Sequence, residues 1–572
     1  NTAIGMNTLF ANTTGSDLVG VGFKALCKNT CGKLNTASGA YSMLNNTTGG
    51  CNTAYGYGSL HDNTTGGNNA AVGACAAFNN TTGINNVAVG VKALFQNTTA
   101  TQNTGVGMFS LQNTSTGGNN TGLGYGTLYS NSTGTNNIAL GACSLYANTS
   151  GAGNTAVGFQ SMCNNTCGNN NTAVGLYALR ANTTAHANVA VGREALRQAT
   201  TGGQNTAVGM QAGYNMTTGY QNVALGETAL FNNTTGIRNT ASGYRALFCI
   251  TSGACNVGIG YYAGYTGTTA AYNVFIGSRA AYSLTTGGQN TAVGKDSMYY
   301  LTSGTHNTAL GNASLLSIST GTYNTGSGSY ALYTTSTGVR NTGLGAHALY
   351  ENTSGNYNVA LGSQALRDNT TGCLNTASGT YALFENTTGC SNTASGYMAL
   401  KNNTTANNST AVGACSLFAN TTGADNTAVG FTALKTNTTG NCNTSIGGYS
   451  LSLNTTGVNN TASGFMALCS NTTGNNNVAI GRNTLRFNTT AHTNTAVGAY
   501  ALTDNTTGAE NTASGYLALG DNTTGGENTA IGYLSMRLNS TGSCNIAIGA
   551  HSLRNATASI KNVAIGRTVM YN

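Results

Sequence analysis

The sequence predicts an all-β fold: a single parallel β-solenoid of 34 turns. Glycine recurs every 17 residues, from Gly5 through Gly22 and Gly39 to Gly566, without an insertion or deletion. A unit of 17 residues is too short for paired-helix repeats, which need about 33 residues, and suits one solenoid turn. Low charge, at 6% of 572 residues, combined with low hydrophobicity would otherwise indicate disorder or low complexity. A disordered chain tolerates changes in length, however, whereas a stack of turns does not.

The repeat unit reads N-T-A-V-G-x-x-A-L-x-x-N-T-T-G-x-x, and we number its repeat positions 1 to 17 from Asn1. Residues 1–572 then form one continuous repeat domain. With strands about 4.8 Å apart, 34 turns predict a slender rod of about 160 Å. One turn buries too few side chains to fold alone, so we expect stability to come from stacking.

The strand of each turn is predicted at repeat positions 2–4, as in residues 2–4 and 19–21. Position 4 is Val, Ile or Leu in 26 of 34 turns, and position 9 is Leu or Met in 30. Because side chains alternate along a strand, we expect positions 2 and 4 to point inward and position 3 outward. Position 3 is Ala or Gly in 32 turns. That uniformity indicates either a flat outer face that packs against another chain or crowding inside a tight turn.

Glycine and asparagine are predicted to form the structural columns. Glycine at repeat positions 5 and 15 indicates corners where a Cβ is excluded. Asn occupies position 1 in 32 of 34 turns and position 12 in 23 of 33. At position 12, Ile250, Leu284, Leu301 and Ile318 replace it, so we expect this position to point inward. A buried Asn must then bond backbone or the next Asn of the column. The column residues we name are Asn1, Asn35, Asn52, Gly5, Gly22 and Gly39.

Fifteen cysteines indicate a secreted, oxidised protein. Four pairs of cysteines are candidates for disulfides. In two of them the cysteines occupy repeat positions 10 and 14 of the same turn. The third pair shares position 16 in successive turns, and the fourth occupies positions 11 and 17 of one turn. A Cα separation of about 5 Å puts the position 16 pair within disulfide range. The odd total leaves at least one thiol free or bonded to another chain. The predicted pairs are Cys27 with Cys31, Cys163 with Cys167, Cys373 with Cys390 and Cys249 with Cys255.

Chemistry for catalysis or cofactor binding is sparse, so we expect neither an active site nor a cofactor. Glu351, Asp368 and Glu385 share position 11 in successive turns, and Asp504 and Asp521 repeat this arrangement. Such carboxylates either bind a cation such as Ca²⁺ between them or splay into solvent. No other metal site is indicated, because the six His are scattered over four repeat positions.

Charge and hydropathy exclude two classes of partner. A net charge of +8 is spread along the chain without a continuous basic stripe, which argues against nucleic-acid binding. No run of about 18 apolar residues exists, so membrane insertion is not expected. The 29 Tyr and 14 Phe lie mostly at positions 6, 7 and 10, where we expect ladders between neighbouring turns.

Threonine dominates repeat positions 13 and 14 and is predicted to form two parallel columns. A regular Thr array is typical of ice-binding solenoids. The alternative is that the hydroxyls satisfy backbone groups of the turn.

Units such as Asn154 to Gly158 and Asn528 to Gly532, each followed by x-x-A-L or a close variant, resemble the head repeats of YadA-like trimeric autotransporter adhesins. They are also similar to repeats of phage tail fibres and bacterial surface proteins. The resemblance covers all 34 turns and implies a left-handed parallel β-roll that is exported, adhesive and commonly trimeric. The uniform 17-residue period and the many cysteines depart from that family.

From these features we expect an extracellular structural or adhesive rod at a cell or virion surface. Both ends of the sequence are ordinary repeats, and open solenoid ends favour assembly with further copies into a filament or fibre. Lateral packing and a host protein or surface carbohydrate as ligand are further expectations. The alternative is an ice-binding array on the Thr columns, and a polysaccharide-cleaving enzyme is the least favoured class.

Overall fold

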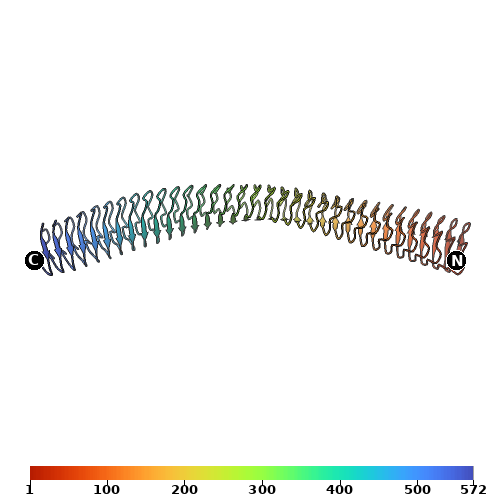
Figure 1. Ribbon diagram of the computed structural model, residues 1–572, viewed down its shortest axis with the longest axis horizontal. Helices are drawn as coiled ribbons and strands as arrows, with labels where there is room; N and C mark the ends of the chain where they lie inside the picture. The colour runs from red at the N-terminus through yellow and green to blue at the C-terminus, as the bar shows by residue number, and fades with distance from the viewer. Residues whose placement is uncertain (571–572) are drawn as a thin grey trace. The chain divides into compact units, whose positions relative to one another are not determined.

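The computed structural model describes residues 1–570 and confirms the predicted parallel β-solenoid with a 17-residue period. Each turn contributes one strand of three residues, and no helix occurs in the described part of the chain. The chain divides into two compact units, Asn1–Gly288 and Gln289–Asn572. Within each unit, successive turns lie side by side and their strands occupy the same side of every turn (Figure 1).

The strands of the first unit are β1 (Thr2–Ile4), β2 (Val19–Val21), β3 (Thr36–Ser38), β4 (Thr53–Tyr55), β5 (Ala70–Val72), β6 (Val87–Val89), β7 (Thr104–Val106), β8 (Thr121–Leu123), β9 (Ile138–Leu140), β10 (Thr155–Val157), β11 (Thr172–Val174), β12 (Val189–Val191), β13 (Thr206–Val208), β14 (Val223–Leu225), β15 (Thr240–Ser242), β16 (Val257–Ile259) and β17 (Val274–Ile276). The strands of the second unit are β18 (Thr291–Val293), β19 (Thr308–Leu310), β20 (Thr325–Ser327), β21 (Thr342–Leu344), β22 (Val359–Leu361), β23 (Thr376–Ser378), β24 (Thr393–Ser395), β25 (Thr410–Val412), β26 (Thr427–Val429), β27 (Thr444–Ile446), β28 (Thr461–Ser463), β29 (Val478–Ile480), β30 (Thr495–Val497), β31 (Thr512–Ser514), β32 (Thr529–Ile531), β33 (Ile546–Ile548) and β34 (Val563–Ile565).

Equivalent residues of successive turns stand in register. In β10 and β11, for example, Thr155 pairs with Thr172 and Ala156 with Ala173, in parallel. The hydrogen bonds between turns continue outside the strands. Leu26 N–H donates to the carbonyl of Ser42 at 3.1 Å. The whole circumference of a turn is therefore bonded to its neighbour, and the repeat length cannot change without breaking these bonds.

The core consists of repeat positions 3, 8 and 9, which corrects the predicted direction of the strand side chains. Ala156 at position 3, Ala178 at position 8 and Leu179 at position 9 are all fully buried. Positions 2 and 4 point outward and position 3 points inward, the reverse of the prediction. The reason is the narrow cross-section. A Cβ added to Gly105, at position 3, would lie 3.5 Å from side-chain carbons of Leu94 and Leu111.

One turn shows how tightly position 3 is packed. Phe275 occupies it in β17 and is 1% exposed. Position 9 is Gly264 in the preceding turn and Ala281 in the same turn, where most turns have Leu. A Cβ on Gly264 would lie 2.7 Å from the Phe275 ring. The ring therefore fills the volume that a leucine occupies in other turns.

The Asn column at repeat position 12 is buried, as the apolar replacements predicted. Asn63 Nδ2 donates to Asn46 Oδ1 at 2.7 Å and to the Gly66 carbonyl at 2.9 Å. Asn80 Nδ2 in turn donates to Asn63 Oδ1 at 2.6 Å. Each amide thus bonds the turn before it, the turn after it and its own turn.

Breaks in this column leave one acceptor without a donor. Where another residue type follows an Asn along the column, the Oδ1 of that last Asn has no hydrogen-bond partner. The following residues begin four separate runs of non-Asn residues: Thr114, Ala199, Ile250 and Ala556. The buried oxygens without partners are those of Asn97, Asn182, Asn233 and Asn539.

A second Asn column lies at repeat position 1. Asn35 and Asn52 are fully buried, whereas Asn1, in the first turn, is exposed. Asn52 donates both its backbone N–H, at 2.9 Å, and its Nδ2, at 3.2 Å, to Asn35 Oδ1. Its Nδ2 also bonds the Gly66 carbonyl at 2.9 Å. This bond ties the start of the strand to the corner glycine of the same turn.

The two glycine columns satisfy different requirements. Gly5, Gly22 and Gly39 at position 5 have φ between +130° and +142°, and a Cβ on Gly39 would lie 2.4 Å from the Gly56 carbonyl oxygen. Glycine is the residue that adopts such a backbone without strain. At position 15 the φ is ordinary, but a Cβ on Gly66 would lie 2.4 Å from Asn63 Oδ1. This column therefore makes room for the Asn amides.

Candidate interaction surfaces

The outer face of the strands carries no charge and combines a column rich in Thr with a column of mostly aliphatic side chains. Repeat positions 2 and 4 form it, and none of the 21 basic and 13 acidic residues lies at either position. Position 2 is Thr in 22 of 34 turns and is Val, Ile or Ala in the others. At position 4, Leu123 is 50% exposed and Ile446 is 45% exposed. Aliphatic side chains thus form an exposed row, which we call the strand face.

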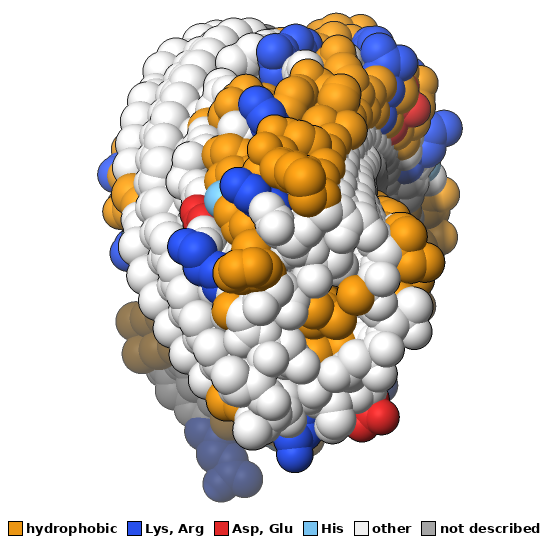
Figure 2. Space-filling model, turned by 90° about the vertical axis from the view of Figure 1, so that its right-hand side faces the viewer, with side chains coloured by type: hydrophobic (Ala, Val, Ile, Leu, Met, Phe, Trp, Pro, Cys, Tyr) orange, Lys and Arg blue, Asp and Glu red, His pale blue; other side chains and the backbone are white. Residues whose placement is uncertain are grey.

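A second row of exposed hydrophobic side chains follows at repeat position 6, beyond the position 5 glycine. Tyr57, Tyr125 and Phe431 belong to it, and each is more than half exposed. This row is interrupted by charged residues such as Arg193 and Lys295. Figure 2 shows hydrophobic and basic side chains gathered on some parts of the surface, and broad uncoloured areas of small polar residues elsewhere.

The two Thr columns differ in what their hydroxyl groups do. At position 13, Thr47 Oγ1 donates to the Thr64 carbonyl at 3.0 Å. The same carbonyl accepts the backbone N–H groups of Thr47, Thr48 and Gly49. Position 14 is exposed in all of its 33 turns and is Thr in 26 of them. The position 13 hydroxyls therefore satisfy the backbone of the turn, and position 14 forms the Thr column that faces solvent.

An open groove runs between the columns at repeat positions 11 and 13, because position 12 points inward. In one segment of the first unit it has a volume of about 590 Å³ and is lined by Gln198, Asn215, Asn232, Cys249 and the threonines 217, 234, 251 and 268. In another segment it measures about 420 Å³, with Lys28, Asn45 and Asp62 on one wall. The groove is thus a property of the repeat, and its chemistry varies with position 11.

Aromatic ladders form between turns, as predicted. One stacked ladder includes these rings at position 10 of the first unit, with centroid separations of 5.1, 5.1, 5.3 and 5.1 Å: Tyr214, Phe231, Phe248, Tyr265 and Tyr282. The ring faces cover one another, so such a ladder mainly strengthens the contact between turns.

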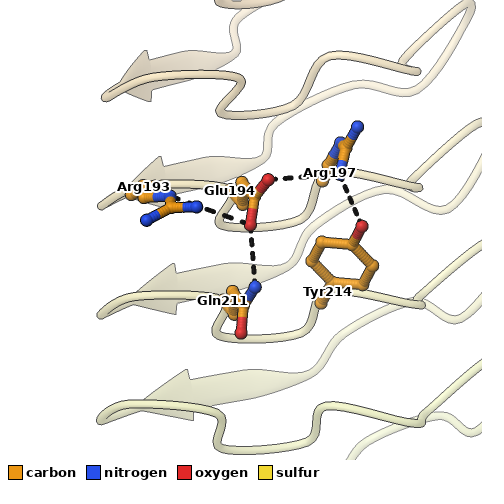
Figure 3. A network of polar contacts seen from close by, with 5 residues as sticks. All are labelled: Arg193, Glu194, Arg197, Gln211 and Tyr214. Atoms are coloured by element: carbon orange, nitrogen blue, oxygen red, sulfur yellow. Dashed lines mark hydrogen bonds and ion pairs between the residues drawn. The ribbon is translucent and has the colours of Figure 1, made fainter.

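A buried carboxylate links two successive turns of the first unit (Figure 3). Glu194 is 7% exposed. Its Oε1 lies 3.1 Å from Arg197 Nη1, and its Oε2 accepts a bond of 2.7 Å from Gln211 Nε2. Arg197 Nη1 also donates to the hydroxyl of Tyr214 at 2.6 Å. The guanidinium of Arg193 is 4.0 Å from Glu194. Every member bonds within the cluster, so we assign it a structural role.

Two carboxyl groups of the acidic columns, those of Asp368 and Asp504, have raised pKa values. Burial raises the pKa of Asp368, the Arg367 guanidinium 3.6 Å away lowers it, and the Glu351 and Glu385 carboxylates raise it further. Burial and the Asp521 carboxylate raise the pKa of Asp504. Within residues 1–570, no three His, Cys, Asp or Glu side chains are grouped so that they could hold a metal ion.

All fifteen cysteines are free thiols in the structure. The sulfur atoms of Cys373 and Cys390 are 2.8 Å apart. Those of Cys27 and Cys31, of Cys163 and Cys167, and of Cys249 and Cys255 make no such contact in the described chain; Cys31 Sγ instead accepts the Thr30 hydroxyl at 3.9 Å. The pairing of these cysteines stays a prediction.

Sequence reasoning missed the strand face, because it assigned the aliphatic side chains of position 4 to the interior. Two signals in the sequence point outward. The first is Tyr55 at position 4, a side chain too large for a narrow core in which position 9 of the same turn is still Leu60. The exchange of Leu for Gly264 beside Phe275 is the second signal, because it indicates that positions 3 and 9 share one volume.

Comparison with protein-family models and with curated proteins finds no match for this chain. The described residues include no helix long and apolar enough to cross a membrane.

Proposed function

We propose that the chain is a structural rather than a catalytic subunit, exported to the cell or virion surface, that associates with copies of itself through the strand face. The observation that carries this proposal is the uncharged, exposed aliphatic row at position 4. Contiguous exposed apolar surface marks interaction sites in soluble proteins, and position 4 is aliphatic in ten successive turns from Val72 to Leu225.

A second copy of the chain is the partner that fits best. The row repeats with every turn, and another copy presents the same spacing, so side chains can interdigitate along its length. The absence of charge at positions 2 and 4 means that two such faces meet without repulsion or buried unpaired charge. The many cysteines support export to an oxidising compartment.

The test is the association state of the full chain, measured by light scattering after size exclusion and by electron microscopy. We expect oligomers or filaments, and we expect the double variant Leu344→Lys/Leu361→Lys, on β21 and β22, to weaken association at least tenfold. The matched control places lysines at position 14 of the same turns, Ser354→Lys/Thr371→Lys. A native chain that stays monomeric at high micromolar concentration would refute the proposal, as would equal effects of the two double variants.

Export is tested separately by alkylating the cysteines of native source material before lysis. Oxidised cysteines in that material support the extracellular assignment, and fifteen fully reduced thiols contradict it.

A second candidate function is ice binding, favoured by the solvent-facing Thr column at position 14. An ordered array of exposed Thr residues at a fixed spacing is the arrangement that this function requires. We expect thermal hysteresis that is lost when Thr371, Thr388 and Thr405 are changed to Tyr together with their neighbours along the column. No hysteresis in the native chain would end this candidate.

A further inference from the structure

Cys373 and Cys390 occupy repeat position 16 of successive turns in the second unit, and the structure directs one side chain at the other. The backbone bond from Ser391 N–H to the Cys373 carbonyl, 2.9 Å long, holds the two turns together at this point. At this repeat position a polar side chain reaches back to the N–H of the preceding turn, as Asn356 Oδ1 does to Val339 at 2.7 Å. Cys390 Sγ does the same and accepts Cys373 N–H at 3.1 Å.

This arrangement brings the two thiols into contact, with their sulfur atoms 2.8 Å apart. Neighbouring turns lie about one strand spacing apart, so the Cα separation falls within the range of disulfides, about 4.4–6.8 Å. Both residues are half-buried, so a small reagent can reach them. Among the described cysteines, no other pair has its sulfur atoms in contact.

We propose that Cys373 and Cys390 are a site of thiol–disulfide exchange, at which a low-molecular-weight disulfide such as oxidised glutathione forms a covalent clip between two turns. The thiolate of one cysteine attacks a sulfur of glutathione disulfide and releases one glutathione thiol. The second cysteine attacks the protein sulfur of the mixed disulfide and releases the second glutathione. Two cysteine thiols are oxidised and one glutathione disulfide is reduced to two thiols, with the two protons transferred to the leaving thiolates.

The clip adds a covalent link between two turns that are otherwise held by hydrogen bonds and core packing, and it limits their separation when the stack opens locally. A disulfide that closes the loop between Cys373 and Cys390 should slow the local separation of the two turns roughly 100-fold. The proposal does not depend on self-association, since both cysteines belong to one chain and lie at position 16, away from the strand face.

The experiment treats the folded full chain with oxidised glutathione, alkylates the remaining thiols and maps the peptides by mass spectrometry. We expect two thiols to disappear first, a cross-linked peptide containing Cys373 and Cys390, and slower hydrogen exchange across residues 373–390. C373S should instead retain one glutathione on Cys390, because the resolving thiol is absent. C163S is the matched control: Cys143 and Cys163 lie on neighbouring turns at different repeat positions, and losing one should not affect the clip.

Three outcomes would overturn the proposal. They are alkylation of both Cys373 and Cys390 after oxidation of the native chain, a separate glutathione on each, and a cross-link that joins either of them to a different cysteine. None of these outcomes depends on whether the chain forms filaments, so failure here is distinguishable from failure of the proposed function.

Discussion

Removing one amide from the position 12 column tests how the solenoid is held together. Asn63→Ala deletes the bonds to Asn46, Gly66 and Asn80, which measure 2.7, 2.9 and 2.6 Å. At about 1 kcal/mol net for each bond, the loss is about 3 kcal/mol. Buried Asn46 Oδ1 is also left without a donor, which adds about 1–3 kcal/mol. We therefore expect about 4–6 kcal/mol of local destabilisation.

The chain should still fold, because four breaks of this kind already occur in it. Long repeat arrays do not unfold in one step, so a global melting temperature is a poor measure. Hydrogen exchange of the native chain resolves local opening instead. At 1.4 kcal/mol for each tenfold change, exchange near residues 46–83 should accelerate about 10³-fold or more.

The control is Thr65→Ala at position 14 of the same turn, a side chain that faces solvent and should change stability by no more than about 0.5 kcal/mol. Exchange that accelerates equally in both variants, or uniformly along the chain, would refute the idea that the amide column bonds neighbouring turns.

Three other sets of substitutions probe the corners, the core and the acidic columns. Gly379→Ala should open its turn locally, because φ is +135° and a Cβ would lie 2.6 Å from the Gly396 carbonyl oxygen. At Gly50 the φ is ordinary and the nearest atom to an added Cβ is 3.1 Å away. The local destabilisation measured by hydrogen exchange should therefore be smaller for Gly50→Ala by at least about 1 kcal/mol. Ala241→Leu at position 3 should destabilise its turn by about 1–3 kcal/mol through overpacking. Ser242→Leu at position 4 should leave stability unchanged and strengthen association. If Ser242→Leu were the more destabilising of the two, position 4 would have to point inward. Because the folded state raises the pKa of Asp504, that carboxyl stabilises the fold most below its unfolded pKa of about 3.9, and this contribution is lost as pH rises through the folded pKa. Asp504→Asn should therefore flatten the pH dependence of exchange in its turn above pH 4, and an unchanged profile would contradict the assigned cause.

The repeat made the fold predictable, because a fixed 17-residue period specifies parallel stacking in register without reference to side-chain direction. The inward direction of position 12 was also predictable, since Ile250 and Leu284 replace Asn there. The direction of positions 3 and 4 was predicted wrongly, because the alanine of position 3 fits both a flat outer face and a crowded interior. Only the width of the turn decides between them, and that width depends on Leu at position 9 and on close approach of the backbone, which the period alone does not specify.

The interaction surfaces were predictable in part. The aromatic ladders followed from the positions of Tyr and Phe. The two Thr columns at positions 13 and 14 were also predicted, but which of them bonds the backbone and which faces solvent was left open. The groove between positions 11 and 13 could not be predicted, because it depends on the inward turn of position 12 between two outward side chains. The proximity of Cys373 and Cys390 followed from their shared position 16 in successive turns, whereas the backward reach of Cys390 Sγ to the Cys373 N–H did not.

The unpaired Oδ1 groups of the position 12 column have a consequence for how the sequence can drift. The cost of a buried, unpaired Oδ1 arises once at each boundary where an Asn segment ends, and not again with each further residue replaced. Replacing Asn148, in the middle of a segment, removes the donor to Asn131 Oδ1 and creates a new boundary. Replacing Asn182, whose Oδ1 is already unpaired, only moves the unpaired oxygen one turn back to Asn165. Adjacent replacements therefore share one unpaired oxygen, whereas separate replacements each create one. Extending an existing non-Asn block, such as the one that begins at Ile250, thus costs less than starting a new one.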